Sequence, residues 1–224
     1  MILSDRQEAG RRLAESLDFL RAEATRGNVV VLAVPRGGVV VGYEIARALK
    51  VPLDVCVTRK IGAPGNPELA VGAVGVAGDV VLDEGLISNL RISRAYLEAE
   101  IARQRQEIAR QLALYRGRRP PPDLRDKIAV LTDDGVATGS TIHAAIRGLQ
   151  PQPLRQLVLA LPVGPPDALA RLEREVDRLV YLQAPEPFWA VGAFYAVFRQ
   201  ISDKEVTGLL ESASEAGDTD QVAS

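Results

Sequence analysis

Two adjacent carboxylates near the middle of the chain stand between a short apolar segment and a run rich in hydroxyl groups. Residues 128–132 have the β-branched and aliphatic composition of a buried strand, Asp133 and Asp134 follow directly, and residues 137–141 read Ala-Thr-Gly-Ser-Thr. The amides that open a helix bind phosphate, and carboxylates bind sugar hydroxyls or a divalent cation. The spacing therefore predicts one turn that binds both the phosphate and the sugar of a ribose phosphate.

An ordinary strand-to-helix turn is the alternative interpretation of this segment. Asp and Thr are common helix caps, but capping alone does not explain two adjacent acids followed by three hydroxyl residues. A Gly-Lys phosphate loop is excluded, because Ser140 follows Gly139 and residues 133–141 contain no lysine.

A second candidate site follows an earlier apolar segment, residues 29–34. Pro35, Arg36, Gly37 and Gly38 come directly after it and precede a helical pattern at 39–49. Two glycines let a backbone approach a ligand closely, and an arginine beside them can bind phosphate oxygens through its planar fork. The alternative is a strand-to-helix turn that uses glycine for its geometry alone.

A third apolar segment, residues 53–57, ends in a basic pair, Arg59 and Lys60. Ligands of open α/β sheets bind beyond the carboxyl ends of the strands, so these turns are expected to converge on one edge of the sheet. There the basic pair would face an anionic ligand. The alternative is a solvated pair of cations that closes a strand.

The elements that must position these residues alternate between strand and helix. Further strands are expected at 154–161 and 178–182, with helices at 142–149 and between those two strands. This order predicts a doubly wound α/β fold with a mainly parallel, five-stranded sheet. We expect a single domain over residues 1–211, followed by a Ser-, Ala-, Gly- and Asp-rich tail, 212–224, that is disordered.

Composition limits the class of protein. Of the 224 residues, 47% are hydrophobic but only 4% are aromatic, which suits a Val-, Leu-, Ile- and Ala-filled core between parallel strands and helices. A net charge of −2 argues against general polyanion binding. The single cysteine, Cys56, the absence of a signal-peptide pattern and the lack of an apolar run near 20 residues predict a cytoplasmic protein without a membrane anchor.

An insertion at 62–122 separates the second and third core strands. Residues 69–86 favour a β-hairpin around Ala77, and Ser93 can cap a long helix that ends near Arg116. Residues 91–119 hold eight arginines and three glutamates, a net charge of +5. The insertion could form a lid or a contact within a homodimer, or its helix could simply expose a solvated basic face.

Most of the aromatic residues lie beyond the last expected strand, at 188–198. Phe188 and Trp189 are candidates for a hood that stacks on a flat acceptor molecule. A small satellite core of aromatic rings is the alternative.

The acidic loop resembles the 5-phosphoribosyl 1-diphosphate (PRPP) loop of the type I phosphoribosyltransferases, in which an apolar strand, two acidic residues and a Thr-Gly pair follow one another. Thr132 and Gly135 depart from the aliphatic residues that the family more often has there. The resemblance implies that residues 137–141 hold the 5-phosphate, namely Ala137, Thr138, Gly139, Ser140 and Thr141. It also implies that Asp133 and Asp134 are the catalytic acids, with Mg²⁺ bound to them directly or through ribose and water.

The turn after the first strand also has a counterpart in that family, where it holds the diphosphate and commonly contains a non-proline cis peptide. The resemblance places that bond near Arg36-Gly37 and assigns the diphosphate to Arg36, Gly37 and Gly38, with Arg59 and Lys60 in support. It implies an enzyme of nucleotide metabolism that transfers phosphoribosyl from PRPP to a nitrogenous acceptor.

Two other functions stay open at this level. One is a regulator that binds PRPP without turnover and contacts nucleic acid through the basic helix, although the net charge and the lack of interleaved aromatic residues disfavour this. The other is a hydrolase of PRPP or another phosphosugar. Some purine enzymes of the family carry an acid before the Thr-Gly pair where this chain has Ala137, so the acceptor and the general base are unassigned.

Overall fold

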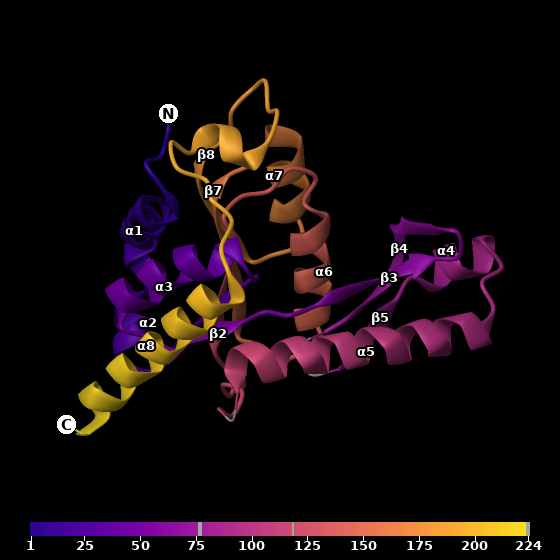
Figure 1. Cartoon of the computed structure of the whole chain (residues 1–224), viewed down its shortest axis with the longest axis horizontal. Helices are drawn as coiled ribbons and strands as arrows, with labels where there is room; N and C mark the ends of the chain where they lie inside the picture. The colour runs from indigo at the N-terminus through magenta and orange to yellow at the C-terminus, as the bar shows by residue number, and fades with distance from the viewer. Residues whose placement is uncertain (76–77, 118, 223–224) are drawn as a thin grey trace.

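The computed structural model describes residues 1–75, 78–117 and 119–222, and its centre is a parallel sheet of five strands (Figure 1). The strands lie in the order β2-β1-β6-β7-β8. Their bounds are Val29–Ala33 for β1, Leu53–Val55 for β2, Ile128–Thr132 for β6, Gln156–Val163 for β7 and Arg178–Gln183 for β8. The predicted doubly wound fold with a five-stranded parallel sheet is confirmed.

Alternate side chains of the central strands enter two separate cores. Val29 and Val31 of β1 belong to one hydrophobic cluster, whereas Val30 and Leu32 belong to the other. Both faces are buried because helices cover both (Figure 1). The first face carries α1, Arg6–Ser16, α3, Gly37–Leu49, and α8, Asp203–Val222; the second carries α6, Ser140–Leu149, and α7, Pro166–Glu173.

Parallel pairing sets β1 and β6 level at their carboxyl ends. Ala33 lies opposite Thr132, and the amide of Val34 donates to the carbonyl oxygen of Thr132 at 2.9 Å. The turn after β1 and the loop after β6 therefore start side by side.

The insertion is an arm that extends from one edge of the molecule (Figure 1). Here "the arm" means residues 59–116 within the described ranges. It comprises a three-stranded antiparallel sheet and two helices: β3, Arg59–Ala63; β4, Asn66–Val74; β5, Val80–Leu82; α4, Glu84–Asn89; and α5, Arg94–Arg116. The hairpin predicted at 69–86 is present as β4 and β5, while Ala77 lies outside the described residues.

The arm differs from its sequence pattern in one strand. Residues 62–67 contain two glycines and two prolines, a composition that favours an irregular turn. In the structure β3 runs to Ala63 and β4 starts at Asn66, so only two residues form the turn. The pairing of β3 with β4 overrides the local preference, with register shifts at Gly62 on both sides.

Polar contacts fasten the inner end of the arm to the core. Arg116 donates to Asp54 of β2 at 2.6 Å, in an ion pair whose side chains are only 14% and 10% exposed. The hydroxyl of Tyr115 donates to Asp203 Oδ1 at 2.6 Å and so ties α5 to α8.

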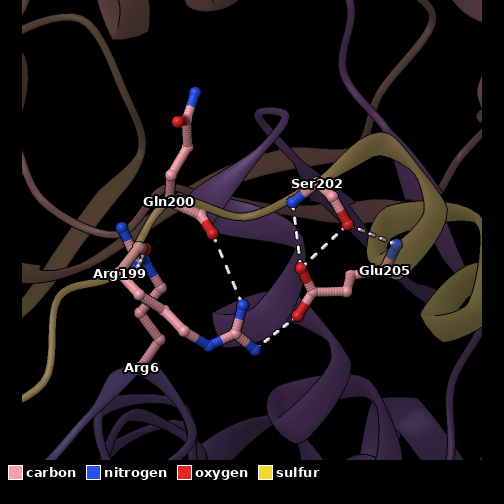
Figure 2. A network of polar contacts seen from close by, with 5 residues as sticks. All are labelled: Arg6, Arg199, Gln200, Ser202 and Glu205. Carbon is pink, nitrogen blue, oxygen red and sulfur yellow. Dashed lines mark hydrogen bonds and ion pairs between the residues drawn. The ribbon is translucent and has the colours of Figure 1, made fainter.

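The C-terminal segment is helical where its composition predicts disorder. Helix α8 continues to Val222, and residues 223 and 224 lie outside the described part. Residues 203–222 contain no proline, and their alanine, serine and acidic residues tolerate helical backbone once the first turns are nucleated. Ser202 and Glu205 form a capping box at its start, with Ser202 Oγ donating to Glu205 Oε2 at 2.9 Å (Figure 2).

Candidate functional site

The two predicted loops meet at the carboxyl end of the sheet, and glycine allows their contact. A Cβ atom on Gly37 would lie 1.9 Å from Asp134 Oδ2, and one on Gly38 would lie 2.8 Å from the Cα of Asp133. Any side chain at either glycine would collide with the acid pair. The structure therefore brings Gly37, Gly38, Asp133 and Asp134 together on one rim.

The turn after β1 contains the non-proline cis peptide, but at a different bond from the expected one. It joins Pro35 to Arg36 rather than Arg36 to Gly37. Arg36 is exposed and precedes the first residue of α3, while Gly38 is buried against the acidic loop. The turn thus presents an arginine side chain to solvent and packs its glycines against the carboxylates.

Two residues that the sequence did not single out hold Asp134. The guanidinium of Arg6 in α1 donates from Nε to Asp134 Oδ2 at 2.7 Å, and this arginine is only 7% exposed. The hydroxyl of Tyr195 donates to the carbonyl oxygen of Asp134 at 2.6 Å. Arg6 lies in the first turn of a helix and Tyr195 lies among aromatic residues, so neither position carried a local signal of this contact.

Burial and mutual repulsion act on the acid pair. Loss of solvent, followed by the neighbouring Asp134 carboxylate, raises the pKa of Asp133 well above that of an exposed aspartate. Burial also raises the pKa of Asp134, while the hydrogen bond from Arg6 acts in the opposite direction. The charge of Arg6 acts on both carboxylates, but Arg6 donates a hydrogen bond only to Asp134.

The hydroxyl-rich segment opens α6 as predicted. Gly139 has φ +80° and directly precedes the helix, which begins at Ser140. The hydroxyls of Thr138 and Ser140 lie 2.8 Å apart, and the side chains of Ala137, Thr138, Ser140 and Thr141 are exposed around buried Gly139. A left-handed glycine followed by the first amides of a helix and by exposed hydroxyl residues is a suitable anion-binding turn.

Comparisons with known proteins agree with this geometry. The family model described as a phosphoribosyl transferase domain matches residues 2–196. The chain belongs to the phosphoribosyl transferase domain family. The predicted family resemblance is therefore confirmed.

Relatives support the same assignment over nearly the whole chain. Proteins from two strains of Mycobacterium tuberculosis, each named "Putative phosphoribosyl transferase", are 41% identical over 226 aligned residues, which cover 99% of this chain. The chain spans about half the length of these curated relatives, 50%. The protein TT1426 from Thermus thermophilus, known from a crystal structure, is 42% identical, with a TM-score of 0.84 over 95% of this chain and 99% of that one.

Arg59 and Lys60 occupy a different place from the one expected for this phosphoribosyl transferase domain. They begin β3 of the arm instead of forming a loop at the rim. Arg59 donates to Glu107 of α5 at 3.0 Å, and both basic residues line a hollow of the arm beside Tyr96 and Arg103. The sequence could not show this, because β2 ends at Val55 and the next strand belongs to another sheet. Their role at the diphosphate stays a prediction.

The aromatic hood splits into a packed part and an exposed part. The ring of Phe188 stacks on that of Phe194 at a centroid distance of 5.1 Å, whereas Trp189 is 82% exposed. A Cβ atom on Gly135, which has φ +145°, would lie 2.7 Å from Val191, so this segment packs on the acidic loop. Phe188 is therefore partly buried against the main hydrophobic cluster, whereas Trp189 projects into solvent, and contact of either ring with an acceptor stays a prediction.

The acid pair fits a metal ion that arrives with its ligand. Among the residues that the structure describes, no three His, Cys, Asp or Glu side chains gather as a metal site. Mg²⁺ commonly binds through one or two protein carboxylates together with substrate phosphates and water. Asp133 and Asp134 supply that number of carboxylates and no more.

Across the described ranges, no helix is both long and apolar enough to span a bilayer.

Proposed function

We propose that this phosphoribosyl transferase domain catalyses PRPP-dependent transfer of the 5-phosphoribosyl group to a nitrogenous acceptor. A nitrogen of the acceptor forms the new bond to C1 of the ribose, and the bond from C1 to the diphosphate oxygen breaks. Diphosphate leaves with that electron pair, and the acceptor nitrogen loses its proton to the departing diphosphate or to water.

The proposed binding mode assigns one part of PRPP to each loop. The amides and hydroxyls of 137–141 receive the 5-phosphate, the acid pair receives the ribose hydroxyls, and the Pro35–Gly38 turn receives the diphosphate. Asp133 and Asp134 would hold Mg²⁺, directly or through ribose and water, and the ion would offset the negative charge of the departing diphosphate.

The work of the protein is then to position groups and to stabilise charge. The ribose gains positive charge as its bond to diphosphate breaks, and the carboxylates beside it favour that charge. Arg36 is exposed at the turn, where its guanidinium can follow the diphosphate oxygens as negative charge accumulates. His143 Nδ1 lies 2.7 Å from the Glu175 carboxylate on the surface, and this pairing supports a structural role for the only histidine.

One observation carries the proposal. The Arg-Gly-Gly turn and the Asp-Asp loop are separated by almost one hundred residues, yet Gly37 and Gly38 lie directly against Asp134 and Asp133. Two loops that hold opposite ends of a phosphosugar must adjoin in this way. The single cysteine, Cys56, is a free and buried thiol, and burial raises its pKa to about 12. A protein without a disulfide suits a reducing compartment, so we propose a cytoplasmic location.

Diphosphate release from PRPP tests the proposal. Purified protein with Mg²⁺ and PRPP should release diphosphate only when a suitable base is added from a panel of purines, pyrimidines and simpler nitrogen acceptors. Release without any acceptor would indicate a hydrolase instead. PRPP binding without release under every condition would favour a regulator that senses PRPP.

The regulator with a nucleic-acid-binding helix receives no support from the arm. Arg103 pairs with Glu100 at 2.6 Å, Arg110 pairs with Glu107 at 2.8 Å, and Arg105 donates to the carbonyl oxygen of Gly78. Much of the positive charge on α5 is thus offset by its own acids.

A further inference from the structure

Arg6 is the buried arginine that joins three separate segments at the rim. Its Nε donates to Asp134 Oδ2 at 2.7 Å, and its Nη1 donates to the carbonyl oxygen of Arg199 at 2.9 Å. The guanidinium carbon also lies 3.8 Å from the ring centre of Phe198. A planar guanidinium with two hydrogen-bond acceptors and a ring face is fixed in orientation, unlike a surface arginine.

The same ion pair adjoins the diphosphate turn. A Cβ atom on Gly37 would lie 1.9 Å from Asp134 Oδ2 and 2.9 Å from Arg6 Nε. The carboxylate oxygen that Arg6 holds is therefore the one that rests on the backbone of the turn. Arg6 thus sets the position of Asp134 and of Gly37 relative to each other.

The two acids consequently have different tasks available to them. Asp134 Oδ2 is occupied by Arg6 and faces the turn. Asp133 accepts the amide N–H of Asp134 through Oδ1 at 2.8 Å, and among the described residues its carboxylate forms no ion pair. Arg6 acts on Asp133 only through its charge, so within the described part of the chain Asp133 is the acid of the pair without a direct contact to a cationic side chain.

We propose that Arg6 is a positioning residue of this site: it holds Asp134 against the Gly37 turn, so that Asp133 is presented to the ribose hydroxyls. This inference rests on the proposed function, because it assumes a ribose phosphate at the acid pair. It adds a residue from outside both loops and assigns different roles to the two acids.

Figure 2 shows the polar network in which Arg6 and Arg199 lie, at the start of α8. Arg199 offers its backbone oxygen to Arg6, while its side chain pairs with Glu205 at the start of α8. Because only the backbone of Arg199 contacts Arg6, the side chain of Arg199 can be changed without removing that acceptor. Arg199→Met is therefore a matched control: it removes an arginine side chain from the same polar network but keeps the backbone acceptor of Arg6.

The test compares the affinity of the protein for ribose 5-phosphate with its affinity for 2-deoxyribose 5-phosphate. Each ligand is titrated into the protein in a calorimeter, with Mg²⁺ present in the buffer. In the unmodified protein the ribose form should bind at least about tenfold more tightly, which corresponds to about 1.4 kcal/mol. Arg6→Met should reduce this ratio to below about threefold, and Arg199→Met should leave it unchanged. A purely structural role for Arg6 would weaken both ligands equally and preserve the ratio.

Each outcome has a definite meaning. If the protein binds PRPP and discriminates between the two sugars, but Arg6→Met keeps the full ratio, Arg6 is not a positioning residue while the proposed function stands. If the unmodified protein binds neither PRPP nor ribose 5-phosphate, the proposed function fails and this inference fails with it. Should Arg6→Met not fold, Arg6→Gln, which keeps one amide donor without charge, must show the same fall in the ratio, and an unchanged ratio overturns the proposal.

Discussion

The rim of the parallel sheet and the arm use the same residue types for opposite purposes. At the rim, Arg6 and Asp134 form an ion pair whose side chains are 9% and 16% exposed. On the arm, Arg103 pairs with Glu100 along one helix, and the arginine is 70% exposed. The first pair joins α1 to the acidic loop, whereas the second links two residues of the same helix at the surface.

The difference in burial decides what each pair contributes. Exposed ion pairs on helices contribute roughly 0.3–0.5 kcal/mol, because water already solvates both charges. Removing one partner of a buried pair costs about 3–5 kcal/mol, since the remaining charge is left without solvent or partner. A basic stretch in a sequence is therefore a poor guide to a functional site until the burial of its charges is known.

The largest expected effect is on turnover, from a change at the rim. Asp133→Asn should lower PRPP turnover by about 10³-fold, because it removes a negative charge from the ribose in the transition state while keeping the shape of the side chain. Diphosphate release measured with the best acceptor tests this. Asp134→Asn is a less clean test, because it also breaks the ion pair with Arg6.

The same variant should raise stability, which separates loss of function from loss of fold. The pKa of Asp133 is raised in the folded state, so its ionisation opposes folding as pH rises through that pKa, and a neutral residue removes this cost. At neutral pH we expect Asp133→Asn to have an unfolding free energy about 1 kcal/mol larger than that of the unmodified protein, and therefore a higher melting temperature. This difference in stability should disappear at acidic pH, where Asp133 is protonated in the unmodified protein as well. A lower melting temperature at pH 7 would contradict the buried, repelled state of this acid.

The next effect concerns the contact between the two loops. Gly37→Ala should cost about 2 kcal/mol of stability and most of the activity, because its Cβ would overlap Asp134 Oδ2 and force the loops apart. Chemical denaturation and the diphosphate assay measure the two losses. Gly208→Ala is the control, since a Cβ at that helical glycine meets nothing within 4 Å and should not destabilise the protein. If Gly37→Ala and Gly208→Ala had the same stability and the same activity, the two loops would not pack as described.

A smaller effect is expected for the exposed arginine of the turn. Arg36→Ala should weaken diphosphate binding by about tenfold, or about 1.4 kcal/mol, and ribose 5-phosphate binding by much less. Calorimetric titration with each ligand gives the comparison, and Arg21→Ala, which removes an exposed arginine of α2, Arg21–Thr25, is the control. If both ligands lose affinity equally, Arg36 does not belong to the diphosphate end of the site.

Much of this rim could be predicted from the sequence because the signals are local. The strand at 128–132, the acid pair and the Thr-Gly-Ser-Thr helix start lie within fourteen consecutive residues, so one motif specifies them. Parallel pairing then requires the turn after β1 to lie beside that motif. The family was identified from these segments alone.

What escaped prediction depends on contacts between distant residues. Arg6 is 128 positions from Asp134, and nothing in the first helical turn distinguishes it from the exposed arginines that follow. Arg59 and Lys60 follow a core strand in sequence, but the chain leaves the parallel sheet at that point and starts another. Their position depends on how β3 pairs with β4, and no pattern at residues 59–60 encodes it.

The smallest expected effect is that of removing the exposed arginines of the arm, whose ion pairs were compared above with the buried pair at the rim. Replacing Arg103, Arg105 and Arg110 together by Ala should change the unfolding free energy by about 1 kcal/mol or less and leave PRPP binding unaltered, because their partners lie on the arm and the three arginine side chains are exposed. Denaturation and PRPP titration check these values. Nucleic-acid binding should be absent from the unmodified protein at low salt as well, since glutamates on α5 offset much of the basic charge of that helix. Salt-dependent binding to RNA or DNA that the triple variant loses would contradict this division, and would make the arm a functional surface in its own right.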